Sequence, residues 1–259
     1  MKNELHSVQN SEAQEISSIL KSIQTEVQKV IVGETDIIQK IILALISGGH
    51  VLVEGPPGTA KTLLIETFAK CFTNSSHAKI QFTPDILPSD IIGFRMLNPT
   101  TGDWKKEPYK GPIFNHFVSA DEINRAPPKA HSALLEAMQE GKVSIVGCEN
   151  PLILPSPFMV LATQNPHESE GVYPLPEALL DRFMFHITLE PKNEKLRTSK
   201  KNEEEKIIEK FTGNKDKDDY FDEIQPLSII KKEADSNKFL EIQKFQKEMI
   251  RSEYIVKYV

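Results

Sequence analysis

The sequence predicts an α/β fold in which helices flank a parallel β-sheet. Short apolar runs typical of buried strands alternate with segments whose apolar residues recur at the helical period. Two of these runs, residues 117–120 and 158–163, are followed by polar side chains, and a third, residues 51–53, is followed by a turn rich in glycine and proline. Because parallel sheets bind ligands at the carboxyl ends of their strands, these three ends are candidates for one functional site.

The composition is that of a globular protein. The 259 residues are 39% hydrophobic and 26% charged, with a formal net charge of −6. This length predicts one and a half to two domains. The polar, mixed-charge composition from Glu190 onward divides a large α/β domain over residues 1–189, in which residues 1–15 are frayed, from a smaller, truncated helical domain over residues 190–259. The acidic balance argues against nucleic acid as the main partner, because non-specific binding to nucleic acid depends on a basic surface.

The sequence contains no recognisable targeting signal or membrane span. The N-terminus has no apolar core of a signal peptide, and the longest apolar run, residues 41–46, is much shorter than a bilayer span. We therefore expect a cytoplasmic protein with no membrane span. Cys71 and Cys148 are far apart in the sequence and fit a reducing compartment without a disulfide.

Two helices are expected before the first strand. Apolar residues at helical spacing predict one helix over residues 16–30 and a second from about Thr35, a candidate N-cap, to the pair Gly48-Gly49. The apolar strand at residues 51–53 follows directly.

The turn after this strand has the composition of a phosphate-binding loop. It reads Gly55-Pro56-Pro57-Gly58-Thr59-Ala60-Lys61-Thr62 and leads into a helical pattern. Backbone N–H groups of such a loop and the positive end of the following helix bind phosphate, with Lys61 reaching the β- and γ-phosphates and the Thr62 hydroxyl holding Mg²⁺. A strict pattern has glycine at Ala60. A simple turn before Lys-Thr is the alternative, and the strand and helix on either side disfavour it.

The next segment combines a strand, an irregular stretch and a hairpin. Residues 78–82 read as a strand, and the prolines and polar turn residues after it predict no regular structure up to residue 93. Residues 94–110 then read as two extended arms around a turn. For Trp104, near the tip, packing on the body of the domain is favoured over exposure as a contact surface.

Asp121 and Glu122 follow the apolar strand at residues 117–120. Acids at a strand end are common at solvent-facing edges, but in a chain with a phosphate loop they predict catalysis. Asp121 is then placed to hold Mg²⁺ through water, and Glu122 to polarise the attacking water.

The remaining elements complete the alternation. A helix is expected to start in Ala126-Pro127-Pro128 and to run until Gly141, followed by a hairpin over residues 142–154, a strand over residues 158–163, a short helix over residues 176–183 and a last strand over residues 183–189. Asn165 follows the fourth strand and can sense a γ-phosphate or simply form a turn before proline; its position alone leaves both open. For Arg182, the neighbouring residues alone favour a surface salt bridge with Asp181.

Several stretches together resemble one family, the MoxR family of AAA+ ATPases. They are GPPGTAKT, QFTPDILPSD, GPIF, ADEINRAPPKAHSALLEAMQEG, LATQNP and YPLPEALLDRF, between Ile31 and Leu189. Alanine at the position of Ala60 is usual in that family. The resemblance implies a AAA+ P-loop NTPase with a five-stranded parallel sheet, a partial C-terminal helical lid, and assembly into a ring, usually a hexamer, with ATP at the subunit boundaries.

The resemblance also assigns roles. Lys61 and Thr62 correspond to the Walker A site, Asp121 and Glu122 to Walker B, and Asn165 to sensor 1. Arg182 resembles the arginine finger that reaches a neighbour's γ-phosphate, an assignment that replaces the salt-bridge interpretation. The nucleotide-binding residues it implies are Ile31, Val32, Gly33, Gly55, Pro56, Pro57, Gly58, Thr59, Ala60, Lys61, Thr62 and Leu63.

The function that the resemblance implies is chaperone-like. Relatives hydrolyse ATP with Mg²⁺ to remodel or mature protein complexes, often for metal or cofactor insertion, together with a partner that contains a von Willebrand factor A domain. Magnesium chelatase ATPase subunits belong to the same broader group. The hairpins near residues 94–110 and 143–154 are similar to family insertions that face the pore or a partner.

One departure leaves alternatives open. Relatives continue into a longer lid with a sensor 2 arginine, and Arg251, the only arginine in the last stretch, has no such motif around it. We expect a fragment of a longer chain, or a protein that hydrolyses ATP poorly. The functional hypotheses are a ring-forming remodelling ATPase, a non-hydrolysing nucleotide switch and, least favoured, a nucleic-acid motor.

Overall fold

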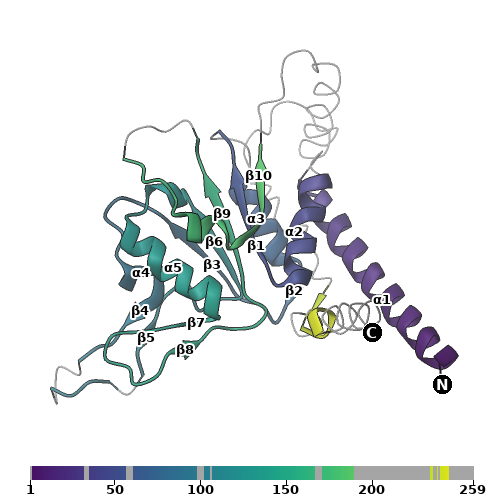
Figure 1. Cartoon of the computed structure of the whole chain (residues 1–259), viewed down its shortest axis with the longest axis horizontal. Coiled ribbons are helices and arrows are strands. Elements are labelled where there is room, and N and C mark those ends of the chain that lie inside the picture. Colours follow the sequence, from purple (N-terminus) through teal and green to yellow (C-terminus); the bar gives the residue numbers. More distant parts are fainter. Residues whose placement is uncertain are drawn as a thin grey trace, which may run out of the picture.

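The computed structural model describes most of the α/β domain and a short piece near the C-terminus (Figure 1). The described residues are 2–31, 35–56, 61–97, 102–105, 107–166, 171–189, 234–235, 238 and 240–244. The helices are α1 (Lys2–Gln28), α2 (Thr35–Ser47), α3 (Lys61–Lys70), α4 (Pro88–Ile92), the 3₁₀ turn η1 (Ile123–Arg125), α5 (Pro128–Glu140) and α6 (Glu177–Leu180). The strands are β1 (His50–Glu54), β2 (Phe72–Thr73), β3 (His77–Gln81), β4 (Gly93–Phe94), β5 (Tyr109–Lys110), β6 (Phe117–Asp121), β7 (Lys142–Val143), β8 (Leu152–Ile153), β9 (Met159–Gln164), β10 (Phe183–Thr188) and β11 (Ala234–Asp235).

A five-stranded parallel sheet forms the centre of the domain and confirms the predicted fold class. Its strand order is β10-β1-β9-β6-β3, and each neighbouring pair is parallel. Because the strands run in one direction, the residues after β1, β6 and β9 all lie at the carboxyl end of the sheet (Figure 1). The three candidate strand ends of the sequence are therefore brought together.

Alternating side chains bury both faces of the sheet. In β1, Val51 and Val53 face a cluster that includes apolar residues of α1, α2 and α3, whereas Leu52 faces a second cluster with α4, α5 and α6. All three side chains are fully buried. Burial of each contributes about 1.5–3 kcal/mol, so the three-layer arrangement holds the strand ends in fixed positions.

Two expectations about helices are wrong. The backbone of α1 is helical from Lys2 rather than from about residue 16, because residues 1–15 contain no glycine or proline and are rich in helix-favouring types. The stretch expected to be irregular contains α4. Pro88 occupies its first turn, where a missing N–H costs nothing, and the Asp90 carboxylate accepts the Leu87 N–H at 2.9 Å.

Both predicted hairpins form, as β4/β5 and β7/β8. The base of the first requires glycine: Gly93 has φ of 91°, and a Cβ there would lie 1.9 Å from the Tyr109 carbonyl oxygen. Trp104 pairs across the hairpin with Leu97 and is 54% exposed. The expectation that Trp104 packs on the body of the domain is therefore wrong.

The described residues near the C-terminus pack on the end of the domain away from the candidate site. β11 pairs with β2, Ile242 is buried beside the cluster that contains α1 and α2, and Gln243 Nε2 donates to the Leu45 carbonyl oxygen at 2.6 Å. The rest of the expected helical domain, residues 190–233 and 245–259 among them, lies outside the described residues. Across the described part of the chain, none of the helices combines the length and apolarity needed to span a bilayer.

Candidate functional site

The phosphate loop starts from a tightly fixed strand end. The Gly55 N–H donates to the Gln164 carbonyl oxygen at 3.2 Å, joining the ends of β1 and β9. A Cβ on Gly55 would lie 2.8 Å from the Leu189 Cβ, so only glycine fits this approach. α3 begins at Lys61 and runs for ten residues, which places the positive end of a helix directly after the loop.

Several predicted nucleotide-binding positions lie outside the described residues. Ile31 is buried, and Leu63 packs partly buried against the core. The undescribed positions are Val32, Gly33, Pro57, Gly58, Thr59, Ala60 and the side chains of Lys61 and Thr62. Their roles stay predictions.

Asp121 is a buried carboxylate with a cation beside it. It ends β6 and is 4% exposed. The Ser119 and Thr163 hydroxyls donate to Oδ1 at 3.4 and 3.3 Å, both long for such bonds. The Lys79 ammonium, on the edge strand β3, lies 2.9 Å from Oδ2. A carboxylate oxygen is the donor type that Mg²⁺ prefers, and this one already attracts a positive charge, so the residues present fit a magnesium site.

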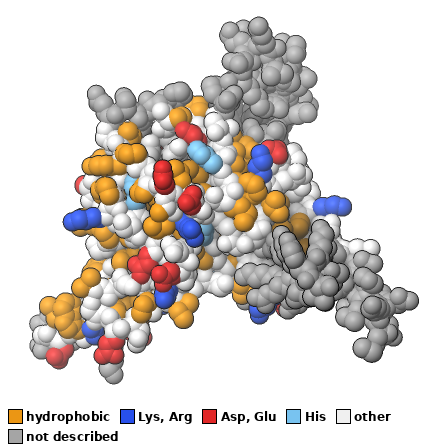
Figure 2. Space-filling view, viewed as in Figure 1, with side chains coloured by type: hydrophobic (Ala, Val, Ile, Leu, Met, Phe, Trp, Pro, Cys, Tyr) orange, Lys and Arg blue, Asp and Glu red, His pale blue; other side chains and the backbone are white. Residues whose placement is uncertain are grey.

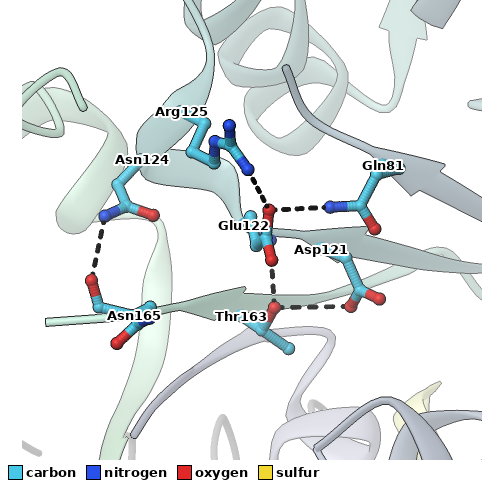
Figure 3. Close-up of polar contacts among 7 residues, drawn as sticks. All are labelled: Gln81, Asp121, Glu122, Asn124, Arg125, Thr163 and Asn165. Atoms are coloured by element: carbon cyan, nitrogen blue, oxygen red, sulfur yellow. Dashed lines mark hydrogen bonds and ion pairs between the residues drawn. The ribbon is translucent and has the colours of Figure 1, made fainter. Parts of the chain in front are cut away.

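Glu122 adopts a left-handed backbone conformation, with φ 57° and ψ 48°. Its N–H donates to Thr163 Oγ1 at 3.0 Å, and its carbonyl oxygen accepts the Arg125 N–H at 2.9 Å. This conformation is uncommon for residues other than glycine and is held here from both sides. It separates the two acids, so that their carboxylates contact different partners (Figure 3).

The Glu122 carboxylate is held by two groups. Gln81 Nε2 donates to Oε2 at 3.0 Å, and an Arg125 guanidinium nitrogen lies 3.1 Å from the same oxygen (Figure 3). The Glu122 and Arg125 side chains are 35% and 37% exposed. Water has access to this carboxylate, as a residue that polarises water requires.

Asn165 lies next to the acid pair. It is 7% exposed, and its carbonyl oxygen accepts a hydrogen bond from Asn124 Nδ2 at 3.2 Å (Figure 3). The turn η1, which follows Glu122, is thereby tied to the end of β9. The structure brings Asp121, Glu122 and Asn165 together, as the sequence predicts.

His131 on α5 contacts the turn η1 through a hydrogen bond. It is buried, and burial lowers the pKa of its imidazole, so the ring is neutral at pH 7. Nε2 lies 2.8 Å from the Ile123 carbonyl oxygen and donates to it. Within the described residues, His131 Nδ1, Asn124 Oδ1 and Arg125 Nε are buried polar atoms without a hydrogen-bond partner.

Arg182 lies at the amino ends of the parallel strands, opposite the end that carries the acid pair. It precedes β10, whose Phe183 pairs with His50 at the start of β1, while Thr188 pairs with Glu54 at the end. At about 3.3 Å per residue, the length of β1 puts Arg182 roughly 16 Å from the edge that carries the acid pair. The side chain is exposed, and the described residues include no ion-pair partner for it. The salt bridge with Asp181 is therefore absent from the described structure, and that interpretation is wrong.

Five residues that contact the acids were not predicted from the sequence, Arg125 among them. Thr163 and Ser119 are polar residues inside otherwise apolar strands, a signal that was available. Lys79 and Gln81 lie on an exposed edge strand, where polar residues are ordinary. Their roles depend on the β3–β6 register, in which Gln81 pairs with Asp121.

Comparisons with known proteins give one consistent result. Residues 50–185 match the family model described as "ATPase family associated with various cellular activities (AAA)". The chain is 50% identical over 177 residues to Chaperone MoxR1 of Mycobacterium tuberculosis, covering 68% of this chain and 45% of that protein. It is 45% identical over 176 residues to YeaC of Bacillus subtilis, covering 68% of this chain and 53% of that protein.

More distant sequence similarity and structural similarity agree. Protein MoxR of Methylorubrum extorquens is 32% identical over 172 residues, with 64% of this chain and 48% of that protein covered. A crystal structure described as a candidate ATPase from Cytophaga hutchinsonii superposes with a TM-score of 0.73 at 39% identity, covering 93% of this chain and 66% of that one. The chain spans about half the length of the curated relatives it matches.

Proposed function

The chain belongs to the MoxR family of AAA+ ATPases, and from this membership we propose that it hydrolyses ATP with Mg²⁺ to remodel or mature other protein complexes. The observation that carries the proposal is the acid pair Asp121 and Glu122, which lies at the carboxyl ends of the parallel strands, the same end at which β1 leads into the loop before α3. The parts have the order of a phosphate-transfer site: loop, helix, metal-binding carboxylate and base.

Each part has a proposed role. Backbone N–H groups of residues 55–62 and Lys61 bind the phosphates, and Thr62 and Asp121 hold Mg²⁺. When bound, Mg²⁺ neutralises charge on the β- and γ-phosphates. Glu122 orients and polarises the attacking water, and Asn165 reports the γ-phosphate or that water.

Arg182 has a proposed role in the site of a neighbouring copy. Arg182 is exposed before β10, about 16 Å along the strand direction from the end of the sheet that carries the acid pair, and β6 lies three strands away from β10. We propose that it completes the site of an adjacent copy in a homo-oligomeric ring, with six subunits as in the family. An arginine supplied in this way accelerates phosphoryl transfer by about 10³–10⁵-fold.

The two hairpins are the proposed contact for a protein client or for a partner with a von Willebrand factor A domain. Figure 2 shows hydrophobic side chains gathered at the end of the molecule where Figure 1 places these hairpins. Aromatic and aliphatic side chains at this density are typical of protein contacts. The exposed residues are Phe94, Met96, Leu97, Trp104, Tyr109, Val146 and Ile153.

Steady-state ATP turnover over a range of protein concentrations tests the function. We expect the rate per subunit to rise with concentration, because sites form between copies. Glu122→Gln should abolish turnover and keep ATP binding, so that it traps a client on co-purification. Glu140→Gln, on the surface at the end of α5, is the matched control and should keep the wild-type rate. A rate per subunit that is flat with concentration contradicts the shared site.

A second function has one observation in its favour. Glu122 Oε2 already accepts contacts from Gln81 and Arg125, which hold the base in place. A protein that keeps these contacts with ATP bound is a nucleotide-dependent assembly switch or a chelatase-type subunit that hydrolyses slowly. ATP binding without phosphate release, unchanged in Glu122→Gln, distinguishes this function from the first.

A further inference from the structure

We propose that Thr163 is a positioning residue for hydrolysis, whose single hydroxyl fixes both members of the acid pair; this inference rests on the proposed function. Thr163 is 3% exposed and lies on β9, the strand next to β6, at whose end the two acids lie. Its Oγ1 accepts the Glu122 N–H at 3.0 Å and donates to Asp121 Oδ1 at 3.3 Å (Figure 3).

The two bonds have a fixed direction. A hydroxyl has one proton, and the Glu122 N–H can only donate, so Thr163 Oγ1 must act as the acceptor there. Its own proton is then available for the Asp121 carboxylate. One oxygen therefore links the metal-binding acid to the backbone of the base.

The bond to Glu122 matters more than the bond to Asp121. Glu122 is in the left-handed region, which is unfavourable for a residue with a Cβ. A buried backbone N–H left without an acceptor adds a further cost, so loss of the Thr163 oxygen favours another conformation of this turn. Asp121 has additional contacts from Ser119 and Lys79 and keeps them when Thr163 is changed.

Substitutions at Thr163 separate positioning from packing. Thr163→Val keeps the shape and removes the hydroxyl, whereas Thr163→Ser keeps the hydroxyl and removes a methyl group. A packing role predicts that valine is tolerated and serine is harmful. The positioning role predicts the reverse: kcat falls up to about 100-fold in Thr163→Val, as expected when a reacting group is misplaced, and returns to within a few-fold of wild type in Thr163→Ser.

Ser119→Ala is the matched control within the same site. Ser119 donates to Asp121 Oδ1 but does not contact Glu122 among the bonds of the described structure. We expect this variant to need more Mg²⁺ and to recover at high Mg²⁺ concentration, whereas Thr163→Val stays slow at any Mg²⁺ concentration. The two variants differ because Thr163, unlike Ser119, accepts a hydrogen bond from the backbone of the turn that carries the base.

The decisive experiment measures kcat at saturating ATP and Mg²⁺ for wild type and the three variants, together with ADP affinity in EDTA and in Mg²⁺. ADP affinity in EDTA should be equal in all four, since the phosphate loop is unchanged. The gain in affinity on adding Mg²⁺ should shrink in Thr163→Val and Ser119→Ala and persist in Thr163→Ser.

The outcomes are distinct. Wild-type turnover retained in Thr163→Val overturns this inference and leaves the proposed function standing. Absence of turnover in wild type, despite ADP binding, overturns the proposed function; an Mg²⁺ gain that is then unchanged in Thr163→Val overturns the inference as well.

Discussion

At the scale of single residues, the site depends on groups that the chain holds under restraint. Glu122 is left-handed, and its carboxylate and backbone both have fixed partners. The positions of Asp121, Glu122 and Asn165 at one end of the sheet were predictable, because each follows an apolar strand, and their roles stay proposals. Lys79 was not predictable, and for Thr163 the sequence offered only its polar type inside an apolar strand, since the partners of both are set by the register between strands that are distant in the sequence.

A buried histidine predicts the pH dependence of stability. His50 is 5% exposed at the start of β1; its Nδ1 accepts the Val160 N–H at 3.0 Å, and its Nε2 lies 3.3 Å from the Met138 carbonyl oxygen. Burial lowers its pKa from 6.5 to about 4. The unfolded chain therefore binds the proton more tightly, so the free energy of unfolding falls as the pH drops from 6.5 towards 4.

The predicted size of this effect is about 2 kcal/mol between pH 7 and pH 5 for a shift from 6.5 to about 4. Urea unfolding at both pH values measures it. His50→Gln should lose less stability on acidification than wild type by about this amount, whatever its stability at pH 7. Equal losses in the two proteins would show that the pKa of His50 is the same in the folded and the unfolded chain, which contradicts the lowered pKa.

At the scale of elements, local patterns predicted the type of each sheet strand but not every helix boundary. The inner strands of the sheet were found because their apolar runs are short and sharply ended, whereas β3 is a mostly exposed edge strand. α1 and α4 were misjudged for opposite reasons: α1 is helical by propensity where the apolar period is weak, and α4 begins at a proline that is allowed in a first turn. The exposure of Trp104 depends on the tertiary position of its hairpin, which no local pattern contains.

Arg95 joins these hairpins and gives a test at this scale. Its Nε donates to the Lys105 carbonyl oxygen at 3.2 Å, its guanidinium also donates to the Gly147 carbonyl oxygen of the second hairpin, and it lies 5.8 Å from the centre of the Trp104 ring. An exposed cation–π contact of this kind contributes about 0.5–1 kcal/mol.

Arg95→Ala should loosen both hairpins without changing nucleotide affinity. Trp104 is the only tryptophan, so its fluorescence reports this directly: acrylamide quenching should increase and the emission should shift to the red. Lys110→Ala removes a different cation, 5.4 Å from the Phe114 ring, and serves as the control. Unchanged Trp104 quenching in Arg95→Ala would mean that the hairpins do not depend on this contact.

At the scale of the whole molecule, the sheet separates the two halves of the proposed site. The acid pair lies at the carboxyl edge, and Arg182 lies at the amino edge before β10. The parallel sheet and its edge of functional residues were predictable from strand ends. The separation of Arg182 was not, since it follows from the pairing of β10 with β1, and local sequence favoured a salt bridge instead.

The shared site is tested most directly by mixing two inactive variants. Glu122→Gln lacks the base but carries Arg182, and Arg182→Ala lacks the arginine but carries an intact acid pair. In a mixed ring, an Arg182→Ala subunit beside a Glu122→Gln subunit forms one complete site. Equal mixing at random fills about a quarter of the sites in this way, so ATP turnover should return to about a quarter of the wild-type rate. A mixture that is as inactive as its two components would contradict a site shared between subunits.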